Sequence, residues 1–256
     1  MRLQALPRSA QESAALTAFL AGFENNQLIR ALPSAIRARW APSLTLLELP
    51  VGMVLAEPGE TIAHVVFPTT AIVSLLNATT TNALTEIAVV GNEGLVGITL
   101  LMGGESTSTG AVVNSAGEGY KMDAATFRTE IAHSTVVLHM LLRYTQALIT
   151  QMAQTAVCNR HHSLHQQLSR WLLLIMDRSS DNELTMTHSE IADALGVRRE
   201  SITEAAQQLQ RTGLIRYTRG HVTILNRPGL ELTSCECYKV VKLEYDRLLP
   251  QRGPSR

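Results

Sequence analysis

Residues 187–211, THSEIADALGVRRESITEAAQQLQR, constrain the fold more than any other stretch of this 256-residue chain. Thr187 is followed three positions later by Glu190, a capping box that marks the start of a helix. Apolar residues then recur at helical spacing until Gly196, which permits the left-handed backbone of a tight turn. A second run of apolar residues at the same spacing follows. The segment therefore predicts two helices joined by a glycine turn, a helix-turn-helix.

The second of these helices begins with charged side chains. Cations at a helix N-terminus oppose the helix dipole, so an arginine pair there needs another partner. In a helix-turn-helix the second helix enters the DNA major groove, where arginine can bond guanine and glutamate can accept from cytosine. A solvated face on a structural hairpin is the alternative. The side chains expected to meet DNA from this helix are Arg198, Arg199, Glu200, Ser201, Thr203 and Glu204.

Basic charge is concentrated in this part of the chain. The whole sequence carries 22 basic and 22 acidic residues, which excludes a uniformly basic nucleic-acid coat. Residues 1–159 hold 8 basic and 11 acidic residues, whereas residues 198–221 hold 5 and 2. The segment LIRYTRGHVTIL, which closes the region, predicts a short β-hairpin with its tip at Arg219 and Gly220.

Residues 43–122 predict a different architecture. Val, Ile, Leu and Thr gather in short runs that glycine-containing turns separate, which indicates an all-β barrel or roll. The expected strands are LTLLELP, GMVLAE, HVVFP, AIVSLLN, LTEIAVVG and GAVVNSAG.

A long helix is expected over residues 134–159, which contain neither Gly nor Pro. One apolar stripe runs along it at spacings of four and three. We expect this stripe to pack against its copy in a second subunit, because a roll covers only part of so long a helix. The alternative is a helix lying across its own domain. The stripe, taken as the dimerisation surface, consists of Val137, Leu141, Tyr144, Leu148 and Met152.

Together, the helix-turn-helix segment, the long helix and a β-region containing GMVLAEPGE and VGNEGLVG resemble the Crp/Fnr family of bacterial transcription regulators. The resemblance covers roughly residues 25–227. It implies an α+β chain with an N-terminal double-stranded, jelly-roll-like β-roll, a long dimerisation helix and a C-terminal winged helix-turn-helix. It also implies a cytoplasmic homodimer that binds double-stranded DNA at a palindromic operator and works with RNA polymerase.

The resemblance also assigns domains and contacts. Arg199 and Glu200 match base-reading positions, Thr187 matches a phosphate contact, and Arg219 and His221 fall in the wing. Glu204 stands where the cyclic-AMP-responsive branch has an arginine, so a different half-site is expected. The expected units are a helical extension (1–24), the cyclic-nucleotide-binding-like roll (25–133), the dimerisation helix (134–160), the DNA-binding domain (161–227) and a C-terminal extension (228–256).

Cyclic AMP is expected to bind weakly or not at all. Nucleotide-binding members carry a glutamate for the ribose and an arginine-serine pair for the phosphate. Between Arg39 and Lys121 the chain has no Lys or Arg, so a buried phosphate would lack a cation. The positions that match the family's effector pocket are Gly97, Ile98, Thr107 and Ser108. No cofactor is expected.

The remaining motifs allow other functions. Cys158, His162 and His165 could share a helix face and bind a soft metal, which gives the alternative of a metal- or redox-sensing regulator. Cys235 and Cys237 give no clear pattern, and the odd number of cysteines fits a reducing compartment. An enzyme is not expected, because the chain has no P-loop, dinucleotide fingerprint or nucleophile elbow. No apolar run is long enough to span a membrane.

Overall fold

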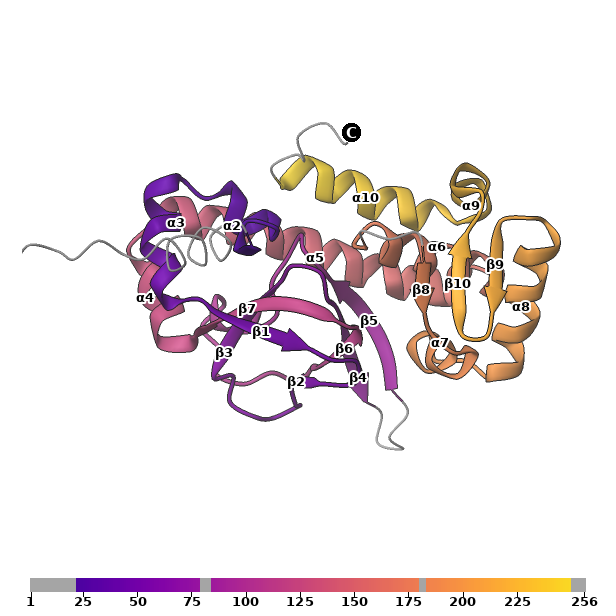
Figure 1. Ribbon diagram of the computed structural model, residues 1–256, viewed down its shortest axis with the longest axis horizontal. Helices are drawn as coiled ribbons and strands as arrows, with labels where there is room; N and C mark the ends of the chain where they lie inside the picture. Colours follow the sequence, from indigo (N-terminus) through magenta and orange to yellow (C-terminus); the bar gives the residue numbers. More distant parts are fainter. Residues whose placement is uncertain (1–21, 79–83, 180–182, 250–256) are drawn as a thin grey trace, which may run out of the picture.

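The computed structural model describes residues 22–78, 84–179 and 183–249. The chain forms a β-roll and a smaller C-terminal unit, and a long helix lies between the roll and the last described helix (Figure 1). Helices and antiparallel sheets are both present, so the expected α+β class is confirmed. The N-terminal extension expected over residues 1–24 lies almost wholly outside the described residues. Among the described helices, none has the length and apolar character needed to cross a bilayer.

The β-roll consists of two antiparallel sheets, ordered β1-β7-β3 and β2-β6-β4-β5. The strands of the roll are β1 (Thr45–Leu49), β2 (Val54–Ala56), β3 (His64–Pro68), β4 (Ile72–Ala78), β5 (Leu84–Val90), β6 (Gly110–Ser115) and β7 (Gly117–Asp123). Strands β1 to β6 coincide closely with the apolar runs predicted from the sequence. Short helices flank the roll: α2 (Gln27–Ala31), α3 (Ser34–Trp40), α4 (Ala124–Ala132), and the single 3-10 turns η1 (Ala41–Ser43) and η2 (Ile98–Leu100).

Strand β7 was not among the predicted strands, although it lies at the centre of its sheet between β1 and β3. Its sequence, GEGYKMD, is polar and contains two glycines, which weakens any β-pattern. The fold explains Gly119: a Cβ there would lie 2.9 Å from the Phe67 carbonyl oxygen of β3. Glycine is required at this point by the close approach of two backbones, which sequence periodicity does not report.

The long helix α5 (Thr135–His161) is present as expected, but its apolar stripe faces the roll rather than a second subunit. Val137, Leu141, Tyr144 and Leu148 are at most 2% exposed within the single chain, and Met152 packs against the same core. The Tyr144 hydroxyl donates to the Leu95 carbonyl of the roll at 3.0 Å. The dimerisation assignment of this stripe is therefore wrong, because the stripe completes the roll's own core.

A different face of α5 stays uncovered. Leu142 and Ile149 are 47% and 57% exposed although both are large and apolar. Ala153 and Ala156 lie on the same face, so that apolar positions recur at spacings of seven, four and three. Such a heptad-like row is typical of a helix that packs against another helix.

The C-terminal unit is a winged helix. Its elements are α6 (Leu164–Met176), β8 (Glu183–Thr185), α7 (His188–Leu195), α8 (Arg199–Arg211), β9 (Ile215–Thr218), β10 (His221–Ile224) and α9 (Arg227–Thr233). The strands form one antiparallel sheet ordered β8-β10-β9. Its core joins the inner faces of α6, α7 and α8, and it also takes in Ile72 and Val89 of the roll. The two units therefore share packed surface.

The last described helix, α10 (Glu236–Leu248), runs alongside α5 and also contacts α6 (Figure 1). Tyr238 and Val241 are buried in the core of the winged helix. Gln151 of α5 donates to the Tyr245 hydroxyl at 3.2 Å. The residues after the hairpin, expected only as an extension, thus contribute to the packing of both units.

Candidate nucleic-acid interface

The helix-turn-helix has the predicted local geometry. Thr187 Oγ1 accepts from the Glu190 backbone N–H at 3.3 Å, and the Glu190 carboxylate accepts from the Thr187 N–H at 2.7 Å. Gly196 ends α7 with φ 66°, in the left-handed region. Arg198 then occupies the N-cap of α8 without a side-chain cap. The capping box, the turn glycine and the start of the second helix are confirmed.

The start of α8 presents charged side chains to solvent. Arg198, Arg199, Glu200 and Glu204 are exposed, and Ser201 is half-buried. Among the described residues, none forms a hydrogen bond or ion pair with either arginine side chain. Side chains that carry charge and have no internal partner are available to a partner molecule.

The hydroxyl of Thr203 is less available than the sequence indicated. Thr203 Oγ1 lies 2.9 Å from His188 Nδ1, and the His188 ring stacks on Tyr217 with centroids 4.1 Å apart. Burial, helped by the nearby charge of Arg199, lowers the pKa of His188. This contact joins α7, α8 and β9. His188 was missed because its role depends on residues distant in sequence.

Gln207 is a second side chain that the sequence reading missed. It is exposed one helical turn after Thr203, on the same side of α8. The spacing of four residues was the signal that could have found it.

The wing is the β9–β10 hairpin. Arg219 and Gly220 both have positive φ (51° and 85°), which is the geometry of a two-residue hairpin turn. Arg219 is exposed, and no described residue forms an ion pair with it. His221 is engaged instead: its Nδ1 lies 2.8 Å from a carboxylate oxygen of Glu183. The predicted tip is confirmed, and Arg219 is the freer of the two wing side chains.

The roll contains a pocket of about 310 Å³, but the expected effector residues do not line it. Gly97, Ile98, Thr107 and Ser108 lie elsewhere, with Gly97 capping η2 at φ 101°. The residues that line this pocket include Glu57, Glu60, His64 and Lys121, with apolar side chains of β2 and β3 around them. This cavity has two carboxylates and one lysine, which suits a phosphate poorly.

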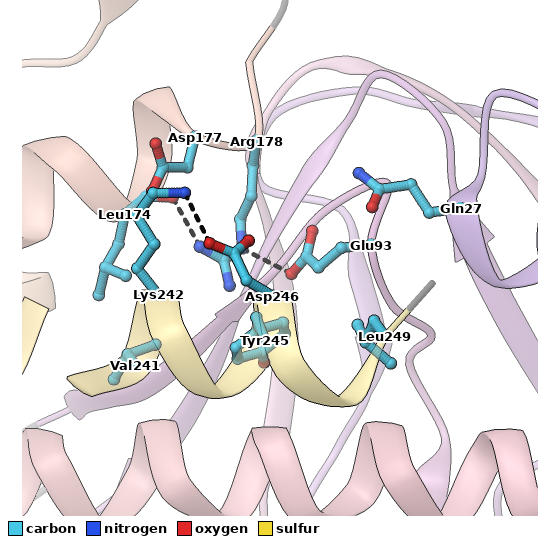
Figure 2. A pocket seen from close by; sticks show the side chains of 10 residues that line it. All are labelled: Gln27, Glu93, Leu174, Asp177, Arg178, Val241, Lys242, Tyr245, Asp246 and Leu249. Carbon is cyan, nitrogen blue, oxygen red and sulfur yellow. Dashed lines mark hydrogen bonds and ion pairs between the residues drawn. The ribbon is translucent and has the colours of Figure 1, made fainter. Parts of the chain in front are cut away.

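A second pocket, of about 220 Å³, lies where the roll meets α6 and α10 (Figure 2). Glu93 of the roll and Arg178 face each other across it, with Arg178 Nε donating to the carboxylate at 2.6 Å. Lys242 and Asp246 on its rim are paired at 3.2 Å. Since these charges are already paired, the pocket is better described as part of the junction than as a ligand site.

Of the three metal-binding candidates from the sequence, two lie together and His165 lies apart. Cys158 and His162 lie close together at the end of α5, and Cys235 and Cys237 join them, with all four ligand atoms within 4.8 Å of one another. His165 is not part of this group. Its Nε2 is buried without a hydrogen-bond partner among the described residues.

The fold has two units, and α8 of the winged helix exposes Arg198 and Arg199, whose side chains have no ion-pair partner among the described residues. Residues 166–233 match the Crp-like helix-turn-helix domain. A search among curated proteins found no match. Solved structures with the same fold include a Crp/Fnr-family transcriptional regulator from Eubacterium rectale (17% identity, TM-score 0.64, 82% of this chain and 98% of that one).

Two further structures share the fold. FixK2 from Bradyrhizobium japonicum has 16% identity and a TM-score of 0.63, over 75% of this chain and 98% of that one. The c-di-GMP-responsive regulator CLP from Xanthomonas campestris has 14% identity and a TM-score of 0.59, over 75% and 99%. This chain therefore has the Crp/Fnr fold with a Crp-like helix-turn-helix domain. Residues 166–233 thus belong to the Crp-like helix-turn-helix domains.

Proposed function

We propose that the protein regulates transcription as a homodimer that places one α8 in each of two successive major grooves of a palindromic operator. The observation that carries this proposal is a pair of exposed arginines, without a partner in the described part of the chain, at the start of a helix that follows a tight turn. Two recognition helices related by a two-fold axis would read half-sites about 34 Å apart. In this role the protein has double-stranded DNA as its partner, with RNA polymerase as the machinery it influences in the cytoplasm.

The proposed DNA contacts are of two kinds: contacts with base edges, which read the sequence, and contacts with phosphates, which position the protein. Arg199 and Glu200 would read base edges, and Glu204 and Gln207 extend the same exposed side of α8. Arg198, Thr187 and the wing residue Arg219 would contact the phosphate backbone, which fixes register without reading sequence.

The dimer is proposed to form through the uncovered face of α5. A buried stripe on one side and an exposed row of Leu142, Ile149, Ala153 and Ala156 on the other leave that row as the apolar surface available for a second copy. Pairing two such helices about a two-fold axis would bring each leucine close to its own copy.

Regulation is proposed to be independent of cyclic AMP. Ile98 stands where nucleotide-binding relatives of the family carry a glutamate, so the ribose would lose its acceptor. The sequence has no Lys or Arg between Arg39 and Lys121, so the segment around Thr107 and Ser108 offers no cation to a cyclic phosphate.

One experiment tests the central claim. Purified protein is used to select sites from random DNA, and Leu142→Glu/Ile149→Glu is compared with Leu232→Glu. Leu232 is 89% exposed on α9 and serves as the matched control. We expect a palindromic site, selected by wild type and control alike, and a monomer with little operator affinity for the double variant in sedimentation. A dimeric double variant, or selection of a site without symmetry, contradicts the proposed assembly. Added cyclic AMP should change neither result.

A further inference from the structure

Four side chains with metal-binding chemistry meet where α5, α6 and α10 come together. Cys158 and His162 lie on the last turn of α5 and at its C-cap, and Cys235 and Cys237 lie at the start of α10. All three cysteines are buried as free thiols. We propose that Cys158, His162, Cys235 and Cys237 bind one tetrahedral Zn²⁺ ion. The proposal goes beyond DNA binding and rests on none of the residues of the reading surface.

The separations of the ligand atoms suit a single ion. Cys158 Sγ lies 3.5 Å from Cys235 Sγ, and Cys237 Sγ lies 3.6 Å from His162 Nδ1. With Zn–S about 2.3 Å and Zn–N about 2.1 Å, neighbouring ligand atoms of a tetrahedron are about 3.5–3.8 Å apart. The widest separation in the group, at most 4.8 Å, requires a shift of about 1 Å. Three thiolates and one imidazole form a closed ligand set that zinc favours in structural sites.

Second, the histidine is held in the required orientation. His162 Nε2 lies 3.3 Å from the Glu236 carboxylate. A proton on Nε2 directed at that oxygen leaves the lone pair of Nδ1 facing the cysteines. Outer carboxylates fix metal-binding histidines in this way. Gln167 reinforces the same turn, because its side-chain amide donates to the His162 carbonyl at 2.8 Å.

Third, the position of Cys235 favours its thiolate. Cys235 occupies the N-cap of α10, where the helix dipole stabilises negative charge.

Fourth, Arg170 supplies a compensating charge. Arg170 is 3% exposed, and its Nη2 donates to Thr155 Oγ1 at 3.2 Å. Its Nε and Nη1 are buried without a hydrogen-bond partner among the described residues. A Zn²⁺ ion with three thiolates and a neutral imidazole has a net charge of −1, because binding releases three thiol protons to solvent. The positive charge of Arg170 would then be balanced by the net negative charge of the zinc site.

The test measures metal directly in full-length protein purified without a metal-affinity tag under reducing conditions. Wild type should contain about one zinc ion per chain by elemental analysis. Cys235→Ser and Cys237→Ser should lose at least about tenfold of that content, in line with loss of a ligand. His165→Gln, a neighbouring histidine outside the group, is the matched control and should keep the ion.

A second measurement covers the case in which a serine variant fails to fold. Co²⁺ added to metal-free wild type should give the intense visible absorption of a tetrahedral cobalt–thiolate site, and His162→Gln should shift that spectrum. Zn²⁺ should protect all three thiols from a thiol reagent. The proposal is overturned by three reactive thiols in folded wild type with excess Zn²⁺, by a weak octahedral cobalt spectrum, or by a Cys158–Cys235 disulfide in place of metal.

Discussion

Charged groups at the reading surface and at the junction between the roll and the winged helix lie in opposite environments. Arg198, Arg199 and Arg219 are exposed, and no described residue forms an ion pair with them. At the junction, Glu93 and Arg178 are 7% and 5% exposed and paired with each other. The contrast teaches that charged side chains in this protein have two uses. Exposed ones are available to bind DNA, and buried pairs hold the roll and the winged helix together. Changing the first kind should alter DNA affinity, and changing the second should alter the free energy of unfolding.

The largest effect is expected from breaking the buried pair. Arg178→Met leaves the Glu93 carboxylate buried without a counter-ion, and it also removes the cation that lies 5.4 Å from the Tyr245 ring centroid. We expect a loss of about 3–5 kcal/mol in the free energy of unfolding, measured with denaturant. Arg39→Ala is the control, because Arg39 is 47% exposed in its pair with Glu130 and should cost less than about 1 kcal/mol. Equal losses of stability in the two variants would contradict the distinction between the buried and the exposed ion pair.

The next effect concerns pH. Burial raises the pKa of Glu86 to about 7, against hydrogen bonds from Ser74 and Trp171 and the charges of Arg170 and Arg178. An unfolded chain releases this proton near pH 4.5, so stability falls as pH rises from about 4.5 to about 7, by about 3 kcal/mol in total. Glu86→Gln should remove that slope in unfolding curves recorded across this range. Parallel wild-type and variant curves would mean that Glu86 ionises normally.

At the reading surface, two arginines should differ in kind. Arg199→Ala should cost about 1–3 kcal/mol of operator binding and relax preference at one base pair per half-site. Arg219→Ala should weaken all sequences alike and lower the salt dependence by about one unit. Binding to matched and mismatched DNA at several salt concentrations separates the two. If both variants lose affinity uniformly, α8 does not lie in the major groove as proposed.

The smallest effect is expected at the contact between the turn of the helix-turn-helix and the roll. Gly196 has φ +66°, and an added Cβ would lie 3.1 Å from Thr85 Oγ1 of the roll. Gly213 has φ +70°, and an added Cβ there would meet nothing within 4 Å. It therefore serves as the control with similar backbone strain and no close contact. Gly213→Ala should cost about 1 kcal/mol. Gly196→Ala should lower the free energy of unfolding slightly more, as measured by thermal unfolding. Equal losses for the two variants would show that Thr85 moves aside without cost.

Local patterns accounted for what the sequence predicted correctly. The capping box of Thr187, the turn at Gly196 and the hairpin tip at Arg219 each depend on neighbours within a few residues. The stripe on α5 was also real, but a stripe shows only that one face is buried and not what covers it. That is why Leu141 was assigned to a dimer although it completes the roll.

Features built from distant segments could not be read in advance. Glu93 and Arg178 are 85 residues apart in sequence, and Cys158 and Cys235 are 77 apart. No periodicity links such positions, because only the tertiary fold brings them together.

The position of α10 after the winged helix in the sequence has a consequence for the order of folding. Its Tyr245 reaches Gln151 across 94 residues, so this contact can form only after the winged helix has been synthesised. The roll and α5 leave the ribosome earlier and can fold first, as N-terminal units generally do. Docking of α10 is then a late event that covers Gln151 and the cysteine at the end of α5. A nascent chain stalled before residue 236 would carry a complete reading helix on an incompletely assembled protein.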